Sequence, residues 1–219
     1  MTGAIIFDLD GTLVHSLPGI ASALNNTLKG HDLPTHEESR VRTFIGNGIV
    51  KLVERAAPDH FNHEQVLQLT QAVRETYAHT WKEGTTAFPG VTETLMQLSH
   101  EGMEIAVLSN KPHGFCEQMT DFIFPEVAFS AVVGQQDGVP AKPDPGAALN
   151  LAKLLQQSPA DVAFVGDSTV DIVTAQRAGM MSIAVTWGYQ DIAELLAHTP
   201  DSSIDHIGDL PGILKNQTT

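Results

Sequence analysis

Two aspartates one residue apart, Asp8 and Asp10, directly follow the short apolar run "AIIF" at positions 4–7. Gly11 comes next and permits a tight turn and a close approach of the backbone to a ligand, and Thr12 follows it. A short apolar run is typical of a buried strand, so both acids stand at its carboxyl edge. Such a pair can divide the work of phosphoryl transfer, with one carboxylate as nucleophile and the other as general acid and base.

Further polar residues follow other apolar runs or stand in the rigid stretch "AKPDP". They are Ser109, Asn110, Lys142, Asp167, Ser168 and Asp171. Each of them taken alone also suits a turn or a helix cap. If the runs are parallel strands, however, the carboxyl ends lie at one edge of the sheet and all these groups converge there.

Three converging carboxylates, Asp8, Asp10 and Asp167, repel one another and need a cation or a proton to coexist. Hard oxygen ligands favour Mg²⁺. A carboxylate about 4 Å from a phosphate charge is repelled by roughly 4 kcal/mol at an effective dielectric constant of about 20. Mg²⁺ and Lys142 would remove that penalty, so the sequence indicates phosphoryl transfer assisted by a metal ion.

Four more short apolar runs resemble the first one. They are "EIAVLSN" (104–110), "SAVVG" (130–134), "VAFVGD" (162–167) and "SIAVTW" (182–187). They are rich in Val, Ile and Ala and are separated by helical patterns. This arrangement is typical of a parallel sheet covered by helices on both faces, and it predicts an α/β fold.

Residues 16–83 break the alternation, because they contain helical patterns and no strand-like run. We expect them to form a helical cap, inserted after the first strand, over a site at the strand ends. The core would then consist of residues 1–15 and 84–219. The stretches around His15 and "TTAFPG" (85–90) are the expected hinges.

Composition narrows the class of protein. The 219 residues are 42% hydrophobic, enough for one sizeable domain with or without an insertion. The formal net charge of -14 argues against nucleic acid as a partner. No apolar run approaches the ~20 residues of a membrane span, and the N-terminus lacks the basic region of a signal peptide. With Cys116 as its single cysteine, we expect a cytoplasmic monomer or homodimer that acts on a small metabolite.

Four motifs, in order, resemble those of the haloacid dehalogenase superfamily. "DLDGT" (8–12) matches its first motif, "LSN" (108–110) its second, "KPDP" (142–145) its third and "GDSTVD" (166–171) its fourth. The resemblance implies a Rossmannoid sheet in the strand order five-four-one-two-three and a helical cap between the first two motifs. Dehalogenases of the superfamily lack the second acid, so Asp10 implies phosphate chemistry.

The resemblance also implies a role for each matching residue. Asp8 would be the nucleophile and a Mg²⁺ ligand, and Asp10 the general acid and base with its backbone carbonyl on the metal. Asp167 would be a further metal ligand with Asp171 as its supporting partner, and Lys142 would neutralise charge. Residues implied to hold phosphate oxygens or to order the site are Thr12, Ser109 and Asn110, with Ser168 in support.

Within the superfamily, several stretches resemble phosphoglycolate phosphatases, including the predicted cap segment "RTFIGNGIVKLVERA" (42–56). Gly46 and Asn47 would present backbone amides to a substrate carboxylate, and Arg42 and Lys51 would add positive charge. In the simpler interpretation, the glycines only separate two cap helices and Lys51 is solvated. The resemblance implies 2-phosphoglycolate as the substrate.

Other functions stay open at this point. Related pyrophosphatases and sugar-phosphate phosphatases carry similar cap segments, and a phosphomutase would use the same two acids. A signalling receiver domain would be about half as long and would carry its phosphorylated acid on a middle strand. A non-catalytic phosphate-binding protein would show no turnover. The chain also departs from many relatives in carrying His15 where they carry aspartate.

Overall fold

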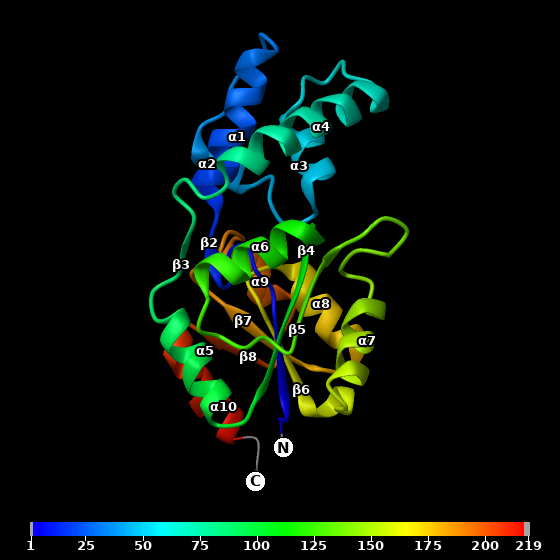
Figure 1. Ribbon diagram of the computed structural model, residues 1–219. Helices are drawn as coiled ribbons and strands as arrows, with labels where there is room; N and C mark the ends of the chain where they lie inside the picture. The colour runs from blue at the N-terminus through cyan, green and yellow to red at the C-terminus, as the bar shows by residue number, and fades with distance from the viewer. Residues whose placement is uncertain (1, 217–219) are drawn as a thin grey trace.

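A six-stranded parallel sheet forms the centre of the molecule, which a computed structural model describes over residues 2–216 (Figure 1). The strand order is β5-β4-β1-β6-β7-β8, and each neighbouring pair is parallel. The strands are β1 (Ala4–Phe7), β4 (Glu104–Pro112), β5 (Ala131–Gln135), β6 (Val162–Gly166), β7 (Met181–Val185) and β8 (Ser202–Ile204).

The predicted α/β fold and strand order are confirmed, with one strand added at an edge. The predicted strands one to five correspond, in chain order, to β1, β4, β5, β6 and β7. Read from β7 to β5, the sheet therefore follows the expected five-four-one-two-three order. The additional strand β8 pairs with β7, and Ile183 is in register with Ser202. Its sequence, Ser-Ser-Ile, has no apolar run, so hydrophobic patterning gave no sign of it.

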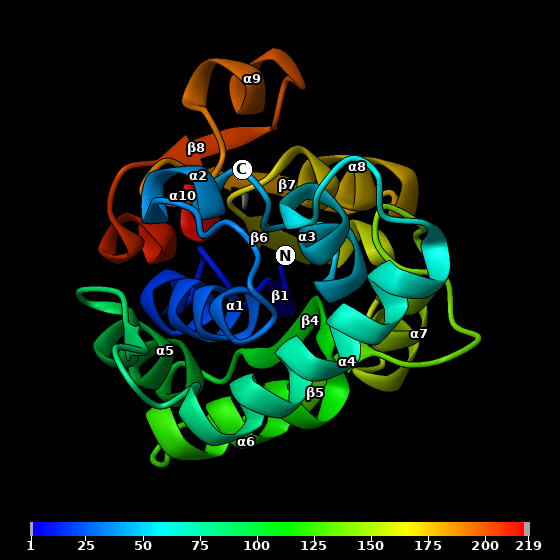
Figure 2. The same ribbon diagram turned by 90° about the horizontal axis from the view of Figure 1, so that it is seen from above.

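Helices cover both faces of the sheet, as the apolar strands require. Ile5 and Phe7 of β1 pack in the cluster that contains α5 (Val91–His100), α6 (His113–Ile123) and α10 (Leu210–Asn216). Ala4 and Ile6 point to the opposite face. The helices on that face are α7 (Gly146–Leu154) and α8 (Thr169–Ala178). Figure 2 shows α5 and α6 on one side of the strands and α7 and α8 on the other.

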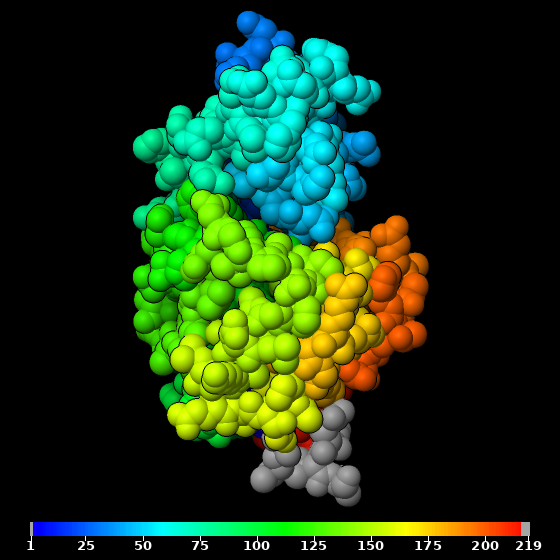
Figure 3. Space-filling view, turned by 90° about the vertical axis from the view of Figure 1, so that its right-hand side faces the viewer, coloured from blue at the N-terminus to red at the C-terminus, as the bar shows by residue number. Residues whose placement is uncertain are grey.

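The chain between β1 and β4 carries four helices that lie beyond the carboxyl ends of the strands (Figures 1 and 2). They are α1 (Leu17–Gly30), α2 (Glu38–Arg42), α3 (Ile49–Ala56) and α4 (His63–Thr80), together called the cap. Helices α1 and α4 pack together, and the Thr27 hydroxyl donates to the Thr76 hydroxyl at 2.9 Å. The helical cap is therefore confirmed, and it rests on the core in the space-filling view (Figure 3).

A short antiparallel ribbon marks where the chain enters and leaves the cap. Strand β2 (Val14–His15) pairs with β3 (Thr86–Ala87). The ribbon coincides with the two expected hinges, and the domain limits at residues 16 and 83 stay a prediction. The remaining elements are α9 (Ile192–Ala197) and the short 3₁₀ turns η1 (Pro159–Asp161) and η2 (Ile207–Asp209). Within residues 2–216, no helix has both the length and the apolar content to cross a membrane.

Candidate active site

The candidate site lies at the carboxyl end of β1, where the strand order reverses. Phe7 is in register with Val107 of β4 and with Val165 of β6, so the residues that follow these three strands meet at one edge. A pocket of about 440 Å³ lies between this edge and the cap. This is the position at which open parallel α/β sheets bind ligands.

The structure divides the predicted site residues between the pocket wall and the layer behind it. Those that line the pocket are Asp8, Asp10, Gly46, Asn47, Ser109, Asn110, Asp167 and Ser168. Thr12, Lys142 and Asp171 are buried behind this wall. The predicted convergence of these polar groups on one edge of the sheet is therefore observed, while their individual roles stay predictions.

Three buried carboxylates form a tight cluster with one lysine. Single oxygen atoms of Asp8, Asp167 and Asp171 all lie within 4.8 Å of one another. The Lys142 ammonium donates to Asp8 Oδ1 at 2.8 Å and to Asp171 Oδ1 at 2.6 Å. Its third contact is the Leu108 carbonyl at 2.8 Å. Lys142 therefore acts on the acids from the side away from the pocket.

The cluster carries more negative charge than Lys142 can balance. Burial raises the pKa of Asp8 to about 6; Asp171 and Asp10 add to the rise, and Lys142 opposes it. Burial also raises the pKa of Asp167 well above its usual range, with Asp171 and Asp8 adding to the effect. Burial disfavours the charge on Lys142, but Asp171 and Asp8 outweigh it and raise the lysine pKa. Buried carboxylates with such a charge excess fit a hard divalent cation.

Two glycines make room for Asp167. Gly11 has φ +89°, and a Cβ atom there would overlap the Asp167 carboxylate. A Cβ atom at Gly188 would overlap the same side chain. Asp167 is held by the Tyr189 backbone N–H, which donates to Oδ2 at 2.7 Å, and by the Thr12 hydroxyl, which donates to Oδ1 at 3.4 Å. Thr12 therefore orders a carboxylate and does not line the pocket.

Asn110 and Ser168 order the groups around the cluster. The Asn110 side chain accepts from the Lys142 backbone N–H at 2.9 Å and donates to its carbonyl at 3.0 Å, so it fixes the segment that carries the lysine. It also donates to the Gly46 carbonyl of the cap at 3.2 Å. Ser168 donates to Asp171 Oδ2 through its hydroxyl at 2.6 Å and through its N–H at 3.1 Å.

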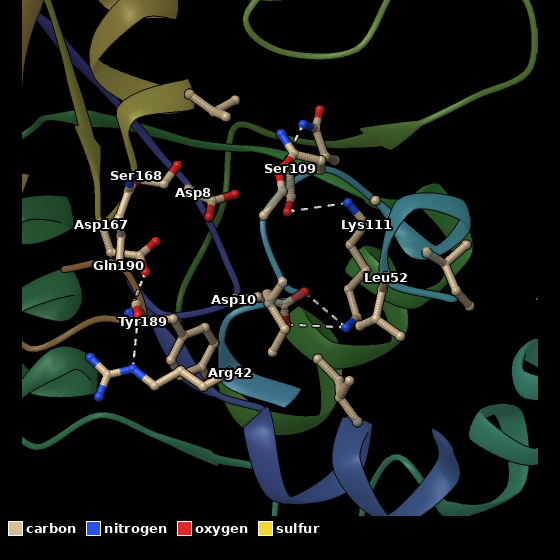
Figure 4. A pocket seen from close by; sticks show the side chains of 18 of the residues that line it. Asp8, Asp10, Arg42, Leu52, Ser109, Lys111, Asp167, Ser168, Tyr189 and Gln190 are labelled. Atoms are coloured by element: carbon tan, nitrogen blue, oxygen red, sulfur yellow. Dashed lines mark hydrogen bonds and ion pairs between the residues drawn. The ribbon is translucent and has the colours of Figure 1, made fainter. Parts of the chain in front are cut away.

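Asp10 stands apart from the three clustered carboxylates and has its own cation. The Lys111 ammonium lies 3.1 Å from Asp10 Oδ1 and 3.0 Å from Oδ2. Figure 4 shows the two side chains pointing toward each other. The Ser16 hydroxyl donates to Oδ1 at 2.5 Å. Each acid of the first motif therefore has a separate lysine, Lys142 for Asp8 and Lys111 for Asp10.

Sequence reasoning missed Lys111 and its cap partner Tyr77. The Lys111 ammonium donates to the Tyr77 hydroxyl at 2.9 Å. Burial raises the pKa of Tyr77 to about 12, so this phenol is neutral near pH 7. Burial disfavours the Lys111 charge, yet Asp10 and Tyr77 outweigh it and raise the lysine pKa. The available signal was a basic residue directly after Asn110, in "SNKP".

Tyr189 was also missed, although it joins the hinge to the acidic cluster. Its hydroxyl accepts from the backbone N–H groups of Ser16 at 2.8 Å and Leu17 at 3.0 Å, where α1 begins. Its own backbone N–H holds Asp167. Two aromatic residues, Trp187 and Tyr189, follow the strand at 181–185, and local sequence does not show which of them lines the pocket.

The cap side of the pocket carries two arginines. Arg42 donates to the Tyr189 carbonyl at 2.8 Å and the Gly188 carbonyl at 2.7 Å, and Figure 4 shows it reaching the core loop. Arg55 donates to the Phe44 carbonyl at 2.9 Å and to Asn47 Oδ1 at 2.6 Å. Within the described part of the chain, neither arginine forms a hydrogen bond or ion pair with a carboxylate.

The sequence left two interpretations of Lys51 open, and the structure agrees with the one in which this side chain is solvated. Its side chain is 57% exposed and pairs with Glu54 at 2.6 Å, and it does not line the pocket. The two residues stand three positions apart on one exposed helix face, where such pairs form readily. Arg55, one turn further along α3, supplies the positive charge near Asn47 instead.

Comparisons with known proteins agree with the fold and with the motifs. Residues 5–185 match the family model of the haloacid dehalogenase-like hydrolases. The chain is 37% identical over 216 residues to a phosphoglycolate phosphatase of Pectobacterium atrosepticum, covering 94% of this chain and 89% of that protein. It is 38% identical over 209 residues to a phosphoglycolate phosphatase of Yersinia pestis, with coverage of 94% and 90%.

A solved structure shares the whole arrangement. It is the crystal structure of a protein described as a "predicted phosphoglycolate phosphatase" from Haemophilus somnus 129PT, with a TM-score of 0.90 and 32% sequence identity. The match covers 96% of this chain and 97% of that one. The family model spans strands β1 to β7 and so includes the cap and all four motifs. The chain therefore belongs to the haloacid dehalogenase-like hydrolase family.

Proposed function

We propose that this chain is a Mg²⁺-dependent phosphatase that hydrolyses a small phosphate monoester, 2-phosphoglycolate, through an aspartyl phosphate on Asp8. The observation that carries the proposal is the pairing of two acids with two different lysines. Asp8 and Lys142 belong to the buried acidic cluster, and Asp10 and Lys111 lie beside it at the pocket. Two carboxylates in separate environments can serve as nucleophile and as acid and base.

The geometry around Asp8 suits a nucleophile. Lys142 engages Oδ1, whereas no described residue donates a hydrogen bond to Oδ2. In the first step Oδ2 attacks phosphorus, the bond between phosphorus and the leaving oxygen breaks, and the carboxyl proton of Asp10 moves to that oxygen. In the second step Asp10 takes a proton from water as the water oxygen attacks phosphorus, which releases phosphate and restores the Asp8 carboxylate.

Asp8 and Asp167 would hold the metal ion, together with the backbone carbonyl of Asp10, and Asp171 stands directly behind them. When bound, Mg²⁺ supplies positive charge that offsets repulsion between the phosphate and the carboxylates. Lys142 offsets the same repulsion from the other side of Asp8. These local charges allow an anionic substrate to bind a protein whose formal net charge is -14.

The two cap arginines support a substrate with a second anionic group. Arg42 and Arg55 line the pocket and hydrogen-bond only neutral oxygen atoms of the described residues. Their charge therefore remains available to a carboxylate at the far end of the substrate. Gly46 and Asn47 lie on the same wall, where we proposed a carboxylate contact. The relatives from Pectobacterium atrosepticum and Yersinia pestis are named for a substrate of this kind.

The proposal is tested by phosphate release from a panel of 2-phosphoglycolate, pyrophosphate, sugar phosphates and p-nitrophenyl phosphate, with Mg²⁺ and with EDTA. We expect turnover that requires Mg²⁺ and is highest on 2-phosphoglycolate. Turnover that is highest on pyrophosphate or a sugar phosphate would contradict 2-phosphoglycolate as the substrate, but it would agree with the proposed phosphatase chemistry. Transfer of the phosphoryl group to another position of a sugar would indicate a mutase, and no turnover on any ester would contradict the proposed enzyme.

A substitution at Arg55 tests the carboxylate contact separately. Arg55→Gln should raise KM for 2-phosphoglycolate by about 10-fold, which corresponds to about 1.4 kcal/mol of lost binding. KM for p-nitrophenyl phosphate, which has no carboxylate, should stay within about 2-fold. Lys51→Gln, on the same helix but outside the pocket, is the matched control and should change neither value. Equal effects of Arg55→Gln on both substrates would contradict the assignment.

A further inference from the structure

Lys111 is a buried lysine that connects the core to the cap. Its side chain is 5% exposed and comes from the end of β4. On one side the ammonium faces both oxygens of Asp10, and on the other it donates to the Tyr77 hydroxyl of α4. The ammonium also lies 4.7 Å from the centre of the Tyr77 ring. One charge therefore contacts the proposed acid and base and the cap at the same time.

Lys111 makes no ion pair with the acidic cluster, because its ammonium faces Asp10, whereas Lys142 contacts Asp8 and Asp171. The two-oxygen contact of Lys111 instead restricts the orientation of the Asp10 carboxylate. Ser16, at the start of α1, fixes the same carboxylate through Oδ1. A group that transfers protons must stay within hydrogen-bond distance of the reacting oxygen, so its orientation bears directly on the rate.

Lys111 itself needs support, because a lysine side chain has about 2 kcal/mol of rotamer entropy to lose when it is fixed. Tyr77 provides this support from the cap. Its ring packs edge-on against Phe115 of α6 with centroids 5.0 Å apart, and its hydroxyl accepts the lysine N–H. If the cap moved away from the core, the hydroxyl would leave with α4 and Lys111 would lose this contact.

We propose that Lys111 is a positioning residue for Asp10, and that the Tyr77 hydroxyl makes this positioning depend on the closed cap. The inference rests on the proposed function of Asp10. Opening of the cap for product release frees Lys111, and closure over a new substrate restores the contact before protons move. The cap then controls the orientation of the Asp10 carboxylate as well as the access of water to the site.

The test compares Lys111→Met, Tyr77→Phe and the double variant with the wild type. Tyr77→Phe removes one hydroxyl and keeps the ring against Phe115, so it tests the idea even if Lys111→Met folds poorly. Thr76→Val is the matched control, because it removes a neighbouring α4 hydroxyl whose partners are Thr27 and Ala72, both in the cap. The readouts are the burst of p-nitrophenolate, the hydrolysis rate of the phosphoenzyme, and KM.

We expect Lys111→Met to give a full burst from p-nitrophenyl phosphate and then to hydrolyse the phosphoenzyme about 100-fold more slowly. Tyr77→Phe should slow the same step by about 5-fold, with KM within about 2-fold of the wild-type value. In the Lys111→Met background the tyrosine change should add nothing further, because the two residues act as one unit. Thr76→Val should match the wild type.

If Tyr77→Phe hydrolyses its phosphoenzyme at the wild-type rate, the inference is overturned. It is also overturned if the effects of the two substitutions are independent and multiply in the double variant. Failure of the proposed function looks different, because the wild type itself would then release no phosphate. In that case the link to the cap is read from small-angle X-ray scattering. Lys111→Met and Tyr77→Phe should then increase the radius of gyration relative to Thr76→Val, and equal values for all three would overturn it.

Discussion

Asp8→Asn is expected to lower phosphate release from 2-phosphoglycolate by at least about 10⁴-fold while leaving the fold intact. Loss of an enzyme's covalent nucleophile commonly removes this much activity or more. The amide has nearly the same shape as the carboxylate, and Lys142 keeps its 2.6 Å contact with Asp171. Removal of one of the crowded negative charges also relieves repulsion within the cluster, so we expect a melting temperature within about 5 °C of the wild-type value.

The matched control is Asp121→Asn, which makes the same chemical change at an exposed position of α6. Phosphate release and thermal unfolding are measured for both variants in parallel. Asp121→Asn should behave as the wild type in both assays. Activity of Asp8→Asn above about one per cent of the wild-type rate would remove Asp8 from the role of nucleophile.

Asp10→Asn should slow the first turnover of 2-phosphoglycolate by about 10² to 10⁴-fold, the usual contribution of a general acid. The expected loss is much smaller for p-nitrophenyl phosphate, because p-nitrophenolate leaves without being protonated. The second step should be slow for both substrates, since an amide cannot take the proton from water. Rapid-quench measurement of leaving-group release separates the two steps.

Both substrates serve as internal controls in that experiment, because the same enzyme and the same nucleophile act on each. Lys111 and Ser16 hold the residue at position 10, so the substitution also tests how far that position controls both proton transfers. An equal loss in the first turnover of both substrates would contradict the general-acid role of Asp10. It would point to a role in metal or phosphate binding instead.

The sequence predicted the core of this fold well, because buried parallel strands have a clear pattern. The apolar runs at 4–7, 104–110 and 162–167 correspond to β1, β4 and β6, and the polar residues that follow them meet at the pocket. The helical segment between the first two strands is also where the cap lies. Strands without an apolar run, such as the Ser-Ser-Ile of β8, could not be found in this way.

The residues that were missed act across the boundary between core and cap. Lys111, on strand β4, contacts Asp10, which precedes it by 101 positions, and Tyr77, which comes from helix α4 of the cap. No periodicity or local spacing shows that three such residues meet. Local sequence also could not show that Arg55 lines the pocket and Lys51 does not. The packing of α3 on the core decides which of the two side chains faces the pocket. Tertiary packing, and not local sequence, sets these contacts.

Location of the phosphoryl group on the protein tests the central claim most directly. The Asp10→Asn variant is mixed with p-nitrophenyl phosphate and Mg²⁺, quenched with acid, digested and analysed by mass spectrometry, with an EDTA sample as the control. Our account predicts one phosphoryl group per chain, located on Asp8 and absent with EDTA. A phosphoryl group on another residue, or turnover by the wild type without any phosphorylated aspartate in this variant, would contradict it.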